Sequence, residues 1–324
     1  MESDYQIVLK GMSDEIASIV SEAVAKTIHN IELANENLDL RRIERIIICT
    51  DFAGELQNLS ASTASGNPIT HTSEEYATAV AKVLLLPKNG DFEIVPVINA
   101  NIIAILGLGD QEKDSDAIDY VTHLLHHELC HVHDDNKKID AYRDDMLRTS
   151  YVGKDMFIRP LAEVSWSEYV ANRLSSQSAT TTAIELMTSS FIDALDRTKV
   201  LVDAEIKAYR HHADLERLLV FFQRHGEFLV KTASYVLGYV DGLQKPLETL
   251  SPIASKRISG SYFEETWQGL HVSLNDMYKE YPGNWKDLTV YDELTAVLET
   301  YYDNMGLVLS TTADNQAYLN VPFR

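Results

Sequence analysis

The run His127-Glu128-Leu129-Cys130-His131 constrains the fold of this chain more than any other feature. It reads H-E-x-x-H, and residues four apart lie on one face of a helix, so both imidazoles can bind the same metal ion. Glu128 then projects beside the ion, where it can accept a proton from a water. A catalytic zinc takes three protein ligands and leaves a fourth position open. The fold must therefore bring a third ligand to this helix from elsewhere in the chain.

The segment Glu168-Tyr169-Val170-Ala171-Asn172 supplies a candidate for that third ligand. Glu168, Ala171 and Asn172 share one face if this segment is helical. Glu168 offers a carboxylate, Ala171 is small enough for two helices to approach closely, and Asn172 can hydrogen-bond the far nitrogen of a ligating histidine. Glu163 is the second choice, because it lacks the small residue and the Asn at the corresponding positions.

H-E-x-x-H followed by E-x-x-A-N resembles the gluzincin metallopeptidases, and most closely their compact ImmA/IrrE-type group. The resemblance covers residues 117–176. It implies a zincin-like fold, His127, His131 and Glu168 as zinc ligands, and Glu128 as general base. Cys130 and His133 depart from the pattern, since many relatives carry Gly and small or apolar residues beside the motif.

A different interpretation starts from the number of histidines. Five of them fall between residues 123 and 133, which makes a chance match to the motif easier. The segment could then be a helix whose histidines are satisfied by ordinary packing. Under the zinc hypothesis, we expect His123, His126 and His133 to be exposed or to hydrogen-bond near the site rather than to bind the metal.

Composition narrows the classes of function. The formal net charge of −21 would repel phosphate backbones and anionic membranes, so we expect neither nucleic acid nor membrane as a partner. Cys49 and Cys130 lie in apolar surroundings and are expected to be buried thiols rather than a disulfide framework. With no apolar leader and no long apolar run, the sequence predicts a cytoplasmic protein.

The fold class expected from the pattern is α+β. The N-terminal half shows signals for a helix over 12–38, a strand over 43–49, a loop over 58–72, a hairpin with strands at 79–86 and 92–98, and the motif helix over 114–133. Asn99-Ala100, at the end of that hairpin, is a candidate for the sheet edge that pairs with an extended substrate. From about residue 181 onward, a 3.6-residue period predicts a helical bundle. The predicted domains are therefore 1–180, zincin-like, and 181–324, helical.

The predicted function is hydrolysis of peptide bonds by a zinc-activated water, with a protein or peptide as substrate. One alternative is a metallopeptidase-like protein that binds a partner and has weak or no turnover, although an intact Glu128 argues against it. Another is hydrolysis of a non-peptide amide. The sequence leaves open which side chain stabilises the transition state, and the candidates are Tyr151, His211, His212, His225 and His271. We expect the metal to lie between the two motif helices, with the helical half closing one side of the cleft.

Overall fold

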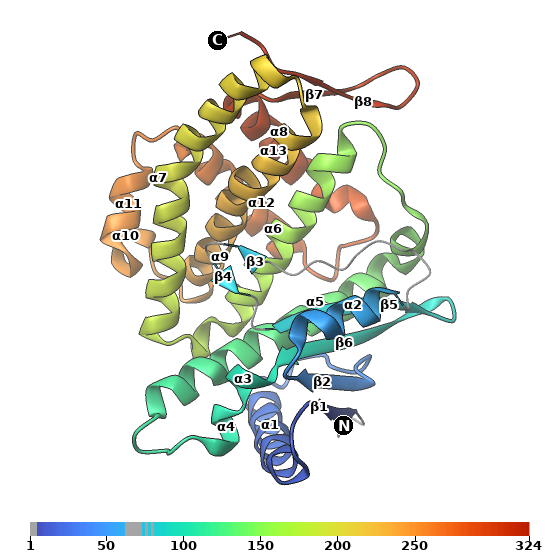
Figure 1. Cartoon of the computed structure of the whole chain (residues 1–324), viewed down its shortest axis with the longest axis vertical. Coiled ribbons are helices and arrows are strands. Elements are labelled where there is room, and N and C mark those ends of the chain that lie inside the picture. The colour runs from blue at the N-terminus through green and yellow to red at the C-terminus, as the bar shows by residue number, and fades with distance from the viewer. Residues whose placement is uncertain (1–4, 62–72, 75–76, 79–80, 324) are drawn as a thin grey trace. The chain divides into compact units, whose positions relative to one another are not determined.

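The computed structural model describes residues 5–61, 73–74, 77–78 and 81–323. The chain is α+β, with a small mixed sheet and a helical C-terminal part (Figure 1). It divides into two compact units, of which the first comprises Met1–Arg143 with Gln177–Thr180, and the second comprises Asp144–Ser176 with Thr181–Arg324. The helix that carries Glu168 thus belongs to the same unit as the C-terminal helices. The predicted domain boundary at residue 180 stays a prediction.

The first unit is built on a four-stranded sheet of order β1-β2-β6-β5. Its elements are β1 (Gln6–Lys10), α1 (Asp14–Ala34), β2 (Arg45–Cys49), α2 (Phe52–Ala61), β3 (Ser73–Glu74), β4 (Ala77–Thr78), β5 (Ala81–Lys88), β6 (Asp91–Asn99), α3 (Ala100–Ile103), α4 (Ile105–Leu108) and the larger part of α5 (Ser115–Arg148). The strand β2 runs parallel to both β1 and β6, whereas β5 is antiparallel to β6. The predicted hairpin is confirmed. It turns at Asn89-Gly90, whose φ angles of 53° and 79° fit the two-residue turn that an Asn-Gly pair favours.

The predicted substrate edge at Asn99-Ala100 is not on an edge strand. Asn99 pairs with Cys49 of β2, and the preceding Ile98 pairs with Ala81 of β5, so β6 has a neighbour on both sides. Ala100 already begins α3. Whether a strand is at an edge depends on which other strands pair with it, here β2 and β5. Among the described residues, the edges of this sheet are β1 and β5.

Alternation along the strands gives this sheet two apolar faces. One face packs against α2 in a cluster formed by Ile47, Cys49, Phe52, Leu56, Leu59, Leu84, Leu86, Val95 and Val97. The residues between them on the strands, among them Ile46, Ile48 and Ile94, are also fully buried. The other face of the sheet is therefore also covered. Strands that are buried on both faces read as continuous apolar runs, as these do.

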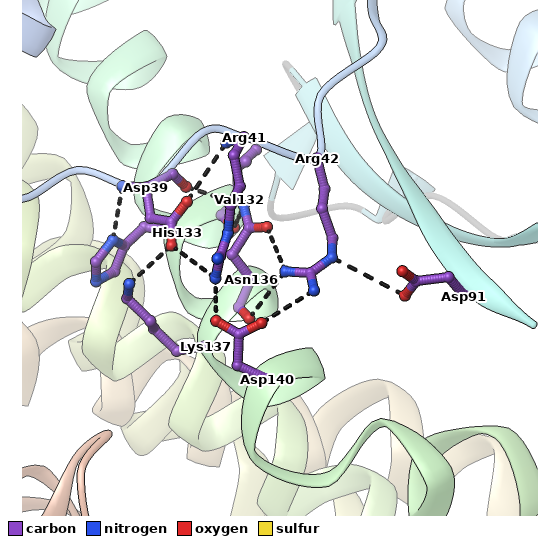
Figure 2. A network of polar contacts seen from close by, with 9 residues as sticks. All are labelled: Asp39, Arg41, Arg42, Asp91, Val132, His133, Asn136, Lys137 and Asp140. Carbon is purple, nitrogen blue, oxygen red and sulfur yellow. Dashed lines mark hydrogen bonds and ion pairs between the residues drawn. The ribbon is translucent and has the colours of Figure 1, made fainter. Parts of the chain in front are cut away.

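The motif helix α5 is held to the segment before β2 by polar contacts (Figure 2). The Asp39 backbone N–H donates to His133 Nδ1 at 2.9 Å, and Asn136 Nδ2 donates to the Asp39 carbonyl at 2.9 Å. Arg42 donates to Asn136 Oδ1 at 3.0 Å and to Asp140 Oδ1 at 2.9 Å. These contacts hold α5 over the two to three turns that follow the H-E-x-x-H motif. The helix extends fifteen residues past the predicted end at His133, with a kink at Tyr142 (φ −150°, ψ 40°).

The second unit is almost entirely helical. Its main elements are α6 (Asp155–Ser175), α7 (Thr181–His212), α8 (Leu215–Phe222), a π-helical turn (Gln223–Glu227), α9 (Phe228–Gly242), α10 (Leu247–Leu250), α11 (Pro252–Ile258), α12 (Glu264–Glu280), a 3₁₀ turn (Leu288–Tyr291), α13 (Asp292–Met305), β7 (Val308–Thr311) and β8 (Ala317–Asn320). A further 3₁₀ turn (Ser176–Ser178) follows α6, and its last two residues belong to the first unit. The helix α13 stops at Gly306, which adopts φ 92° after the last helical turn.

Two glycines let α6 and α9 pack at unusually short range. A Cβ added at Gly238 would lie 2.5 Å from the Tyr169 carbonyl oxygen, and one at Gly242 would lie 2.4 Å from the Arg173 carbonyl oxygen. Both contacts are with backbone, which cannot rotate aside. Small residues at i and i+4 bring helix backbones together, and here they set the side chains of α9 directly against the face of α6 that carries Glu168.

One predicted loop differs in part from the structure, and some strands were not predicted. Residues 58–61 of the predicted loop continue α2, while 62–72 lie outside the described residues. The strand β1 and the hairpin β7–β8 were missed, because short, partly exposed strands give weak periodic signals. Both cysteines are free and buried, as predicted. In the part of the chain that the structure describes, no helix is long and apolar enough to cross a membrane.

Candidate metal centre

His127 and His131 point toward each other from consecutive turns of α5. Their Nε2 atoms lie 3.0 Å apart, and the two rings are nearly perpendicular, at 88°. His127 is buried and His131 is half-buried. Two ligands of one metal ion require this arrangement, because each imidazole directs its Nε2 atom to the same point.

The spacing of these two nitrogens fits zinc. Two nitrogens that each lie about 2.0–2.1 Å from a tetrahedral ion are separated by about 3.3 Å. The observed 3.0 Å is close to that value, so a small rotation of either ring would admit the ion. Glu128 follows His127 directly and is partly exposed, as a group that must exchange protons with a bound water requires.

The other three histidines of this helix are engaged elsewhere. His123 Nδ1 and His126 Nδ1 lie 3.0 Å and 2.8 Å from the Ser178 hydroxyl, and His133 Nδ1 accepts the Asp39 N–H. All three are buried rather than exposed. Burial, together with the neighbouring histidines, lowers the pKa of His123 to about 3 and that of His126 to about 4, so both are neutral near pH 7. All three hydrogen bonds involve Nδ1, and the expectation that these histidines do not bind the metal stays a prediction.

Glu168 lies on α6 in the second unit and is buried. Its Oε1 atom forms an ion pair with Lys231 Nζ of α9 at 3.0 Å. Ala171 and Asn172 are also buried on this helix, as the spacing predicted, and Asn172 Nδ2 donates to the Glu168 carbonyl oxygen at 3.0 Å. This bond orients the Asn172 amide within α6. The predicted bond from Asn172 to a ligating histidine stays a prediction.

The alternative ligand and one candidate donor engage each other. The Tyr151 hydroxyl donates to Glu163 Oε1, and burial together with this bond raises the pKa of Tyr151. Glu163 is therefore held by a neighbour five residues before Glu168 on α6. This contact gives Glu163 a structural role.

The histidine candidates for a transition-state donor lie in several places in the second unit. His271 Nε2 contacts Asp241 Oδ1 at 2.8 Å, His225 is buried in the π-helical turn against Phe221, and His212 Nδ1 accepts the Asp214 N–H at 2.9 Å. His211 is exposed at the end of α7. Nothing in these contacts selects one of them as the donor.

Sequence reasoning missed Lys231, which forms an ion pair with Glu168. The sequence marks the face of α9 that carries Lys231 as a packed face, but not which residue lies opposite it. Lys231, Gly238 and Gly242 are spaced by seven and four residues, so they share one face of α9, and the G-x-x-x-G pair marks that face as the one packed against another helix.

Comparison of the chain with protein-family models, with curated proteins and with solved structures returned no match.

Proposed function

We propose that this protein is a zinc-dependent metallopeptidase of gluzincin type, with His127, His131 and Glu168 as ligands. Each of the three offers one ligand atom, and two imidazoles with one carboxylate form a group that could hold a metal ion. The observation that carries the proposal is the convergence of the two Nε2 atoms at 3.0 Å on a helix that also presents Glu128.

The donor set favours zinc over harder ions. Imidazole nitrogens suit zinc and other borderline metals, whereas calcium and magnesium take oxygen ligands. Two histidines and one glutamate leave the fourth tetrahedral position for water, as in catalytic rather than structural sites. When bound, zinc would act as a Lewis acid on a carbonyl oxygen and increase the acidity of water.

Each residue of the site would then have its own role. His127 and His131 hold the metal from one helix, and Glu168 completes the ligand set with its negative charge. Glu128 accepts the proton of the attacking water and returns it to the leaving amine, which allows the peptide bond to break without releasing an unstable anion. The strand β5 lies at an edge of the sheet among the described residues, which is where an extended peptide adds to a sheet.

The Glu128→Gln variant tests the catalytic part of this proposal. Gln keeps the size and polarity of Glu but cannot accept a proton, so we expect zinc content and folding to be unchanged and peptide hydrolysis to fall by about 10²–10⁴-fold. The measurement is cleavage of an unfolded protein such as casein, followed in parallel with zinc content and circular dichroism. Glu185→Gln, at an exposed position on α7, is the matched control and should leave the rate within about twofold. Undiminished hydrolysis by Glu128→Gln would remove Glu128 from the mechanism.

A further inference from the structure

Lys231 places a positive charge directly beside the carboxylate that we assign to the metal. Its Nζ atom is 3.0 Å from Glu168 Oε1, and only 10% of the Glu168 side chain and 26% of the Lys231 side chain are exposed. The pair is held by the helices themselves, since Gly238 and Gly242 bring α9 against α6 over the next three turns. The packing therefore places the backbone of Lys231 within reach of Glu168.

This position has a consequence for any cation that Glu168 binds. A zinc–carboxylate bond is about 2.0–2.2 Å long. If Oε1 is the ligating atom, the ammonium and the metal lie at most about 5 Å apart, because the two distances add to this value only in a straight line. The attraction between Lys231 and Glu168 exists with and without the metal, so it cancels from the metal's affinity. The repulsion between Lys231 and the metal does not cancel.

We propose that Lys231 is a positioning residue that weakens zinc binding by sharing the carboxylate of Glu168 with the metal, which keeps the ion exchangeable. This inference rests on the proposed function, because it needs Glu168 as a ligand. The lysine can either stay in place and repel the metal, or swing away on its flexible stem and lose its ion pair. Both routes lower the affinity of the site for a divalent cation.

The sign of this effect separates it from a purely structural role. A side chain that only props up the site would, on removal, weaken metal binding. Removal of a repelling charge strengthens it. Repulsion between a single and a double positive charge at about 5 Å corresponds to roughly tenfold in affinity even when it is screened as in bulk water.

The experiment is a measurement of the zinc dissociation constant by competition with a chromogenic chelator, at fixed pH and ionic strength. We expect Lys231→Met to bind zinc about tenfold more tightly than the wild type, and Lys231→Arg, which keeps the charge, to stay within about threefold of it. Lys207→Met removes one charge from an exposed position on α7 and is the matched control, with no expected change. Lys231→Gln serves as the second variant if Lys231→Met does not fold.

Glu168→Gln in the same assay distinguishes the two levels of the account. Weaker zinc binding by Glu168→Gln, together with tighter binding by Lys231→Met, supports both. If Glu168→Gln binds zinc as the wild type does, the proposed ligand set is wrong. If Glu168→Gln weakens binding but Lys231→Met leaves it unchanged or weakens it, Glu168 remains a ligand and the role given to Lys231 is overturned.

Discussion

Gly238→Ala tests how the packing of α6 against α9 supports the site. The added Cβ would lie 2.5 Å from the Tyr169 carbonyl oxygen and 2.7 Å from Asn172 Cβ. Ordinary contacts begin at 3.4 Å, so the helices must separate locally by about 0.7–0.9 Å (3.4 − 2.7 and 3.4 − 2.5). Overpacking of this kind costs about 1–3 kcal/mol, and the better helix propensity of alanine returns up to about 1 kcal/mol. We expect a net loss of about 1–2 kcal/mol.

That loss corresponds to a fall in Tm of roughly 2–8 °C for a unit of this size, and thermal unfolding followed by circular dichroism measures it. Because α6 carries Glu168, the displacement should also weaken zinc binding. Gly283→Ala is the matched control, since its Cβ would meet nothing within 4 Å, and its Tm should not fall but rise by roughly 1–4 °C, because alanine restricts the unfolded chain. A Gly238→Ala variant as stable as the wild type would refute the close packing of these helices.

Two further predictions concern the polar networks of the two units. Arg42→Met should lower the free energy of unfolding by about 1–3 kcal/mol, because it removes charge-assisted bonds to Asn136 and Asp140 that anchor α5. The control Lys113→Met, at an exposed ion pair, should change it by less than about 1 kcal/mol. Urea unfolding measures both variants, and equal effects would contradict the anchoring role of Arg42. Burial raises the pKa of Asp241, but hydrogen bonds from His271 and Tyr169 outweigh it and lower this pKa overall. A carboxyl group whose pKa is lowered by folding stabilises the fold at pH values above its ordinary pKa, and this stabilisation is lost as the pH falls through the lowered pKa. The Tm difference between wild type and Asp241→Asn should therefore be largest near pH 7 and shrink toward pH 3. A Tm difference that is constant over this range would contradict the prediction.

The hairpin and the histidine pair of the N-terminal half could be predicted from the sequence, because each depends on residues that lie close together in the chain. Asn89-Gly90 between two apolar runs predicts a hairpin of the kind found. The i, i+4 spacing of His127 and His131 determines their common face once the segment is helical. Asn99 was misplaced because an edge strand is defined by its neighbours, and pairing between distant strands leaves no mark in the strand's own sequence.

The surroundings of Glu168 show the complementary limit. Its burial and that of Ala171 and Asn172 followed from helical spacing. Its partner Lys231 did not, because 63 residues separate the two positions and only tertiary packing brings them together. The same holds for His123 and His126, whose common partner Ser178 lies beyond α6 in the sequence. Periodicity predicts which face is buried, but not what lies opposite that face.

The zinc content of the purified protein tests the central claim most directly. Elemental analysis of the wild type, His131→Ala and Glu168→Ala, each dialysed against the same zinc-buffered solution, should give one zinc per chain for the wild type and substantially less for both variants. Lys231→Met, measured alongside, should retain a full zinc. Equal zinc in the wild type, His131→Ala and Glu168→Ala would contradict the assignment of this site.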